Sequence, residues 1–213
     1  MCVTPEFRGR GRLYSLTQSG GILADSIDRE SAYPIMTPKV RSTHPKAWYR
    51  VLKTRYGEGP ALETLNAAQC EWGGRGVEWV PLRSQLKLLN EVELRFGNGS
   101  QSIVRYLAAE AVRHYPSVRR LLMRALPLRL LIDLTPGAYL KEFNHGRIEI
   151  DQSQGRAKFR QYDWLSSPAR CAAWLGSYEG VFAWMGTRKA TVTKGECMLR
   201  GDDFCGYVAT WDE

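Results

Sequence analysis

Apolar residues recur every three or four positions in the middle of the chain, a spacing that predicts helices. The first such helix starts at Pro81 and places on one face Leu82, Leu86, Leu89, Val92 and Phe96. A second runs from Ser100 to about Tyr115. A third starts at Pro116 or Ser117 and is kinked or divided at Pro127, with an apolar side formed by Val118, Leu121, Leu122, Ala125, Leu126 and Leu130. We expect these helices to form one layer.

The pattern changes to alternation after Pro136, which predicts strands. Ala138–Phe143 and Arg147–Asp151 are expected to form a hairpin, and Arg156–Tyr162 a further strand. A helix over Ser166–Met185 and strands near Lys189–Glu196 and Phe204–Thr210 complete the chain. The order of elements predicts an α+β fold, in which a helical layer packs on one face of a mainly antiparallel sheet of four to five strands.

The helix over 166–185 has two apolar faces, which predicts a central position in the domain. One face carries large residues and the other carries Ala173, Gly176, Gly180 and Ala183, where another element can approach closely. Aromatic residues are dense in and before this helix. We interpret six of them as candidates for a pocket that binds a small apolar ligand, the alternative being that they only fill the core: Tyr162, Trp164, Trp174, Tyr178, Phe182 and Trp184.

Three regions are predicted along the chain. Residues 1–42 are rich in Gly, Ser, Pro and Arg and are expected to form a flexible basic arm. Residues 43–80 are expected to form a helical extension and a loop, and residues 81–213 the binding domain. No apolar run approaches the roughly 18 residues that a membrane span needs, and no signal sequence is evident, so a cytoplasmic protein is expected.

The formal net charge of +8 favours an anionic partner without naming one. Six arginines in the second and third helices could form either a solvated surface or an anion- or partner-binding face: Arg105, Arg113, Arg119, Arg120, Arg124 and Arg129. Together with the basic arm, such a face could bind nucleic acid, with an affinity that falls as salt rises. No recognition helix or RNA-binding aromatic signature is visible, so nucleic-acid binding ranks third among the functions considered.

The five cysteines are an odd number in a chain without an export signal, which favours thiols or metal ligands over disulfides. Cys197 and Cys205 are separated by seven residues that include a turn, and Cys171 stands 26 residues before Cys197. These three sulfurs could converge. Two interpretations remain open, a zinc site with sulfur ligands and a set of inert buried thiols.

The last quarter of the chain resembles the ending of the 4-vinyl reductase domain family. The matching positions are Gly176, Glu179, Gly180, Cys197, Gly201, Asp202 and Cys205. The resemblance implies a fold shared with TRAPP vesicle-tethering subunits, haem nitric-oxide-binding domains and sensor domains of aromatic-responsive activators. Members of this superfamily bind small hydrophobic ligands or partner proteins, and residues 1–80 have no counterpart in the match.

The resemblance also implies a zinc site. In the phenol-sensing relatives three cysteines and a glutamate hold zinc, and Cys171, Cys197 and Cys205 are similar to those cysteines. Lys194 stands where the glutamate is expected, and a cation cannot replace it as a ligand, so Glu196, Asp202 or water has to serve. A structural zinc ion is therefore the one cofactor considered.

Haem is not expected from the sequence. Tyr115, Ser117 and Arg119 match a signature of the haem-binding relatives. They stand ahead of the predicted sheet, however, and no histidine precedes them in the helices until His44 apart from the adjacent His114. We interpret the match as chance.

Catalysis is not expected either. The chain has three histidines in scattered positions, no Gly-rich nucleotide-binding turn, and no Ser/His/Asp set in a recognisable context. The predicted function is a non-enzymatic signalling or regulatory domain that binds a small hydrophobic ligand, a partner protein, or both. The alternative is a ligand-free interaction module that forms a homodimer through its helical layer.

Overall fold

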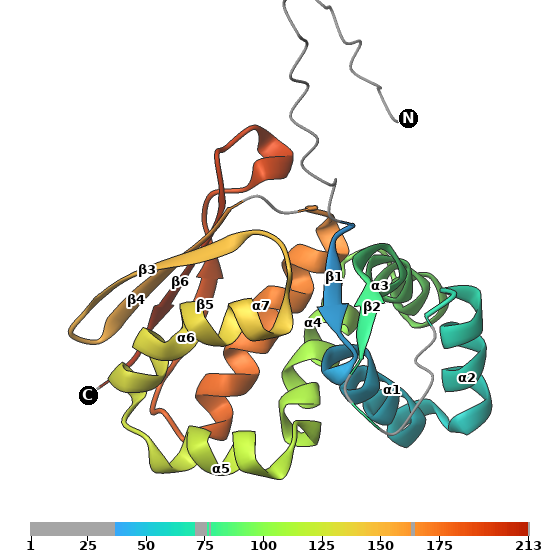
Figure 1. Ribbon diagram of the computed structural model, residues 1–213, viewed down its shortest axis with the longest axis horizontal. Coiled ribbons are helices and arrows are strands. Elements are labelled where there is room, and N and C mark those ends of the chain that lie inside the picture. Colours follow the sequence, from blue (N-terminus) through green and yellow to red (C-terminus); the bar gives the residue numbers. More distant parts are fainter. Residues whose placement is uncertain (1–36, 71–75, 77, 163–164, 213) are drawn as a thin grey trace, which may run out of the picture. The chain divides into compact units, whose positions relative to one another are not determined.

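The structure is a computed structural model that describes residues 37–70, 76, 78–162 and 165–212 (Figure 1). Its α-helices are α1 (Thr43–Tyr56), α2 (Glu58–Ala67), α3 (Leu82–Phe96), α4 (Ser102–Ala111), α5 (Ser117–Ala125), α6 (Leu128–Glu142) and α7 (Pro168–Trp184). Its strands are β1 (Lys39–Arg41), β2 (Trp79–Pro81), β3 (Arg147–Ser153), β4 (Arg156–Tyr162), β5 (Thr191–Lys194) and β6 (Cys205–Thr210). Most of the predicted basic arm lies outside the described residues.

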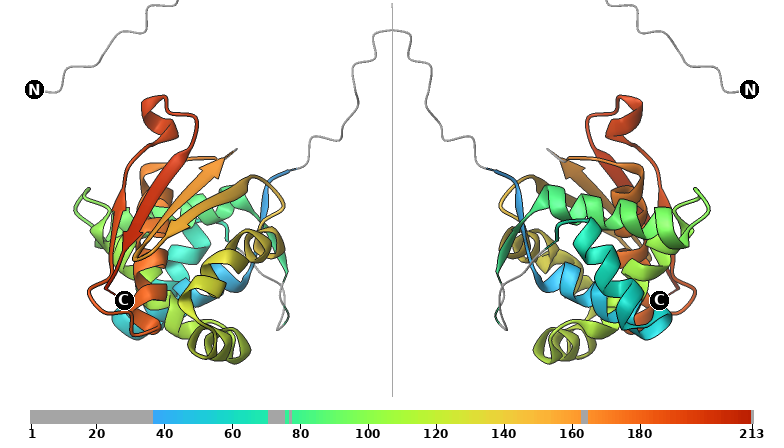
Figure 2. Two further views of the ribbon diagram at one scale, coloured as in Figure 1. Left: turned by 90° about the vertical axis from the view of Figure 1, so that its left-hand side faces the viewer. Right: turned by 90° about the vertical axis from the view of Figure 1, so that its right-hand side faces the viewer.

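A four-stranded antiparallel sheet has the order β3-β4-β6-β5. Phe159 in β4 faces Ile150 in β3 and Tyr207 in β6, so the central strands carry large rings into the core. The strands lie along one side of the body and the helices along the other (Figure 2). The predicted α+β fold with a helical layer on one face of the sheet is confirmed. A second sheet pairs β1 with β2.

Helix α7 connects the sheet to the other helices (Figure 1). The Ser167 hydroxyl accepts a hydrogen bond from the Arg170 backbone N–H at 3.1 Å, and Pro168 stands in the first turn, so the helix begins where its sequence predicts. Tyr178 and Phe182 pack with Phe159 and other residues of the sheet. On the opposite side α7 approaches α4 closely, which confirms the two packing faces.

Helices α1 to α4 share one core cluster with part of α7. Its buried members include Leu52 in α1, Leu65 in α2, Leu88 in α3 and Leu107 in α4. Residues 43–67 therefore pack into the same body as the helices that follow. The predicted boundary at residue 81 stays a prediction.

The prediction that Ala138–Phe143 forms the first strand of a hairpin is wrong. Residues 138–142 belong to α6, which continues through Pro136, and the hairpin is formed by β3 and β4 instead. Tyr139 and Phe143 are four residues apart and their rings stack at 4.7 Å, as helical spacing requires. The alternation of apolar and polar residues over this short run predicted a strand. A helix forms instead because it buries these two rings, which are each 4% exposed.

The predicted third helix is divided at Pro127 into α5 and α6, as expected. Its predicted apolar side does not face the core, however. Val118 and Leu121 are each 67% exposed and Leu122 is 48% exposed, whereas Met123 is the residue of α5 that is buried. Helix α5 therefore packs through one methionine and presents leucines to the surface.

Candidate functional site

A cavity of about 440 Å³ lies between α1, α5, α6, α7 and the sheet. This volume is within the range of small-ligand sites. Leucine and isoleucine side chains from α5 and α6 form much of its wall. Its aromatic lining residues come from α1, α6, α7, β4 and the segments that precede α5 and follow α6: Trp48, Tyr115, Tyr139, Phe143, Phe159, Trp174, Tyr178 and Phe182.

Three of the six aromatic residues predicted to line a pocket do line this cavity, namely Trp174, Tyr178 and Phe182. Tyr162 instead lies against Phe204, with ring centroids 5.3 Å apart. Its position one residue after the buried Gln161 turns it to the outer face of the sheet. Trp184 packs under α5, where its ring nitrogen donates to the Arg120 carbonyl at 3.4 Å. Trp164 lies outside the described residues.

The sequence prediction missed the contributions of α1 and α6 to the cavity. Trp48 was placed in a separate extension, and Tyr139 and Phe143 in a strand. The i, i+4 spacing of Tyr139 and Phe143 was the signal that could have placed them on one helix face. The position of Trp48 beside them depends on tertiary packing and has no local signal.

A group of polar side chains lies at one end of the cavity. His44 Nε2 is 3.5 Å from Glu142 Oε2, and Arg119 Nη1 is 3.3 Å from Glu142 Oε1. The Arg119 guanidinium also lies over the Tyr115 ring at 4.3 Å. His44 Nε2 and Glu142 Oε2 are buried and have no hydrogen-bond partner of acceptable geometry among the described residues. Such atoms favour a ligand group that can hydrogen-bond to them.

Burial decides the charge states at this end. It lowers the pKa of His44 to about 3, with the nearby Arg119 and Arg170 acting in the same direction. Burial raises the pKa of Glu142, while Arg119 acts against that shift. His44 is therefore neutral at pH 7, and the cavity end combines a neutral imidazole, a carboxyl group and a guanidinium.

The buried Arg170 and the half-buried His145 form a second polar pair beside the cavity. Arg170 Nη2 lies 3.4 Å from His145 Nε2, and Arg170 Nη1 donates to the Leu165 carbonyl at 3.2 Å. Burial lowers the pKa of Arg170 to about 9 and that of His145 to about 4. The Arg170 guanidinium stays charged at pH 7 and gives the part of the cavity beside it a positive potential.

The neutral state of His44 predicts a loss of stability in acid. Because the folded pKa is below the ordinary 6.5, the unfolded chain binds the proton first as pH falls below 6.5. Lowering the pH from 7 to 5 should cost the folded state about 2 kcal/mol through His44. The contribution of Glu142 to this pH dependence has the opposite sign. Because its pKa is raised in the folded state, lowering the pH stabilises the folded state through this residue.

Chemical unfolding of the wild type and of His44→Gln at both pH values would measure this effect. We expect the variant to lose about 2 kcal/mol less than the wild type over the same interval. An equal pH dependence in the two proteins would show that His44 titrates normally in the folded state.

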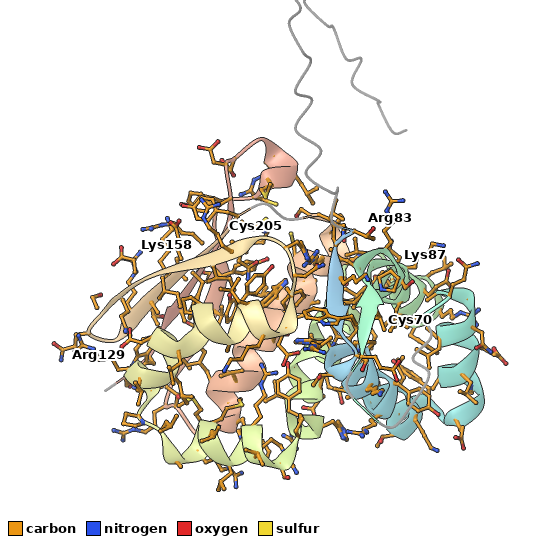
Figure 3. The ribbon with its side chains drawn as sticks, viewed as in Figure 1. Cys70, Arg83, Lys87, Arg129, Lys158 and Cys205 are labelled. Atoms are coloured by element: carbon orange, nitrogen blue, oxygen red, sulfur yellow. The ribbon has the colours of Figure 1, made fainter. Side chains whose placement is uncertain are left out.

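The three predicted cysteines meet in space. Cys171 comes from the first turn of α7 and Cys197 from the segment after β5. Cys205 stands at the start of β6 and is labelled in Figure 3. Their sulfur atoms all lie within 4.8 Å of one another, and the Sγ atoms of Cys171 and Cys197 are 4.0 Å apart. All three are buried. The arrangement can hold a metal ion, and the sulfur-rich donor set suits zinc.

The carboxylates considered as fourth ligands are occupied elsewhere. Glu196 forms an ion pair with Lys158, and the Asp202 carboxylate accepts a hydrogen bond from the Cys197 backbone N–H at 2.6 Å. Ser166 Oγ lies 3.4 Å from Cys171 Sγ and 3.5 Å from Cys205 Sγ, a position that the sequence prediction missed. Ser166 or a water molecule is therefore the better placed fourth group for zinc.

Lys194 lies beside the sulfur cluster. Burial acts to lower its pKa, but the sulfurs of Cys171 and Cys205 raise the pKa overall. A hydrogen bond from Cys171 lowers the pKa of Cys205 to about 4, while the same contact raises the pKa of Cys171. The Lys194 ammonium therefore lies where it can balance negative charge on the sulfurs.

The six arginines predicted as one face have different neighbours. Arg105 pairs with Glu179 across α4 and α7, with Nε donating to Oε2 at 2.7 Å. Arg113 pairs with Glu110 at 3.2 Å. The guanidinium of Arg124 lies over the Trp184 ring at 4.2 Å, with Arg120 at 5.7 Å. Arg129 is exposed at the start of α6. A function for the whole set stays a prediction.

Comparison with known proteins identifies the fold. No family model and no curated protein matches the sequence. An H-NOX protein from S. oneidensis in the Fe(II)NO ligation state matches with a TM-score of 0.64 and 14% identity, covering 81% of this chain and 99% of that one. A single-residue variant of Tt H-NOX matches with a TM-score of 0.62 and 14% identity, covering 81% and 95%. A third H-NOX structure, from work on haem distortion, matches with a TM-score of 0.61 and 13% identity, covering 81% and 95%. At such identities the likeness shows the fold alone.

The expectation that haem is absent is not supported by these neighbours. Tyr115 and Arg119, whose match to a haem signature was interpreted as chance, both line the cavity together with His44. His44 is neutral and is the one histidine among the cavity-lining residues. Its Nε2 faces Glu142 at 3.5 Å, so iron could bind there only if this contact opened. Among the cavity-lining residues, His44 is the side chain that could bind a haem iron.

Proposed function

We propose that this chain is a non-enzymatic regulatory domain, related to the 4-vinyl reductase family, that binds a small hydrophobic ligand in the cavity between α1, α5, α6, α7 and the sheet. The observation that carries the proposal is the cavity itself, with its volume of about 440 Å³ and its predominantly apolar lining. Burial of the ligand there would supply the binding free energy. The H-NOX fold, in which other chains hold a ligand, is consistent with it.

The polar end of the cavity defines which ligands fit best. The unpartnered Nε2 of His44 and Oε2 of Glu142 would hydrogen-bond to one polar group of the ligand. The remaining wall offers leucine, isoleucine and aromatic surface, so the rest of the ligand is apolar. The lowered pKa of His44, about 3, makes this imidazole a weak base near neutral pH.

Native mass spectrometry of the purified full chain tests the proposal. We expect a co-purifying small molecule, or failing that a fluorescence increase of the apolar dye 1-anilinonaphthalene-8-sulfonate on binding. Ser177→Phe should reduce either signal at least about tenfold, because Ser177 lines the cavity and the ring fills it. Ala67→Phe, an exposed change on α2, is the control and should leave the signal unchanged. No bound compound and no dye binding in the wild type would refute the proposal.

Haem is a second candidate ligand, favoured by the position of His44 in the cavity. Its test is the visible absorption spectrum of the protein after incubation with haem. An intense Soret band that is shifted or lost in His44→Ala would support it, and a spectrum equal to that of free haem would exclude it.

A structural zinc ion at Cys171, Cys197 and Cys205 is proposed independently of either ligand. Homodimer formation and a cytoplasmic location stay predictions.

A further inference from the structure

The apolar stripe of α5 is turned to solvent. Val118, Leu121, Leu122 and Ala125 follow the i, i+3, i+4, i+7 spacing of one helix face, and all four are exposed. In a surface helix such a stripe normally packs on the core. Here the buried side of α5 is reduced to Met123. Within the described residues, the stripe is therefore left largely uncovered.

Exposed leucines of α6 lie next along the chain after α5. Leu130 is 42% exposed and Leu134 is 49% exposed. We define the α5–α6 face by its exposed apolar residues, which are Val118, Leu121, Leu122, Ala125, Leu130 and Leu134. Within the described residues no helix is long and apolar enough to cross a membrane.

Arginines outnumber acidic residues along α5 and the start of α6. Between residues 113 and 134 the chain carries Arg113, Arg119, Arg120, Arg124 and Arg129, against the single acid Asp133. Arg124 and Arg129 are exposed, and no carboxylate within ion-pair distance of either was found among the described residues. Leucines on one side of a helix with arginines beside them are typical of segments that lie in the interface of an anionic bilayer.

We propose that the α5–α6 face docks on an anionic lipid bilayer, with its leucines inserted among the acyl chains and Arg124 and Arg129 at the lipid phosphates. Charge complementarity selects this occupant over a second copy of the chain. A two-fold interface through this face would place two arginine-rich surfaces against each other, and like charges repel. An anionic bilayer offers apolar depth and negative charge to the same face.

The position of the cavity agrees with this docking. Leu122 and Leu134 belong both to the α5–α6 face and to the cavity lining. The cavity therefore borders the surface that we place on the bilayer. Under the proposed function, a hydrophobic ligand dissolved in lipid would reach the cavity without crossing water. Bilayer docking itself does not depend on a ligand being bound.

Co-sedimentation of the full chain with vesicles tests the docking. We expect binding to phosphatidylcholine vesicles that contain phosphatidylserine and at least tenfold weaker binding to phosphatidylcholine alone. The double change Val118→Glu and Leu121→Glu should abolish binding, since it places charge at two inserted positions. Leu94→Glu is the matched control, because Leu94 is 78% exposed on α3 and outside the face.

A matched pair of arginine variants tests the contribution of positive charge to vesicle binding. Arg129→Gln should weaken binding about fivefold, as expected for one arginine near an anionic surface. Arg83→Gln removes an exposed arginine of α3, far from Arg129 in Figure 3, and should have no effect. Absence of binding to the anionic vesicles would overturn the proposal, and so would an equal loss of binding in the test and control variants. A third contrary result is a wild type that is a dimer, binds no vesicles, and becomes a monomer on the double change Val118→Glu and Leu121→Glu.

Discussion

Replacement of Gly176 by alanine should lower the free energy of unfolding by about 3 kcal/mol. A Cβ atom at this position would lie inside the van der Waals contact distance of the Arg105 carbonyl oxygen and close to the rest of that peptide group. The obstacle is backbone of α4, which cannot rotate away as a side chain can. Helices α4 and α7 would have to separate, and buried residues of both, including Leu107 and Ala173, would lose contact.

Urea unfolding followed by circular dichroism would measure this change. Gly137→Ala is the control, because Gly137 is also in a helix and a Cβ atom there would meet nothing within 4 Å. The control should be as stable as the wild type or slightly more so, since alanine is the better helix former. A loss below about 0.5 kcal/mol in Gly176→Ala would mean that α4 and α7 are not held at this distance in solution.

The small-residue face of α7 was predictable because its signal is local. Gly176 and Gly180 recur one turn apart, and a helix tolerates such residues where another backbone comes close. The identity of the opposing helix was not predictable. Arg105 and Ala109 stand more than 70 residues before the glycines that they contact, and nothing local to either segment encodes the pairing.

The cavity and the α5–α6 face show a second limit of prediction from sequence. Periodicity predicted α5 correctly as an amphipathic helix, but it cannot tell whether the apolar side meets the core or a partner. The same uncertainty applies to the aromatic residues. Trp174 and Trp184 stand on one helix, yet one lines the cavity and the other lies under the arginines of α5. Tertiary packing alone separates these roles.

The cysteine cluster was predicted more fully than the cavity. Resemblance in the last quarter of the chain, together with the spacing of Cys197 and Cys205, indicated that three sulfurs converge, and their atoms do lie within 4.8 Å. Ser166 was missed as a neighbour because a serine before a helix is normally a cap. Here Ser167 caps the helix, and Ser166 is left to face the sulfurs.

The substitution Cys197→Ser separates a zinc site from inert buried thiols. Protein prepared without chelator should contain about one zinc ion per chain, since three thiolates and one further donor satisfy tetrahedral coordination. Cys197→Ser should lose this metal and, at free zinc about 1,000 times the dissociation constant, about 4 kcal/mol of stability. The ion would join α7, the segment after β5, and the central strand β6, so the loss should affect the whole fold.

The control for this experiment is Cys70→Ser. Cys70 is buried at 3% exposure outside the cluster, and burial raises the pKa of its thiol to about 12, so it is not poised to bind metal. This variant should keep the zinc even if packing costs it some stability. Zinc analysis by plasma emission and thermal unfolding with and without chelator would be compared for both variants. If the wild type contains no zinc and chelator leaves its melting temperature unchanged, the three sulfurs do not form a metal site. The resemblance to zinc-holding sensors then stops at the position where lysine replaces glutamate.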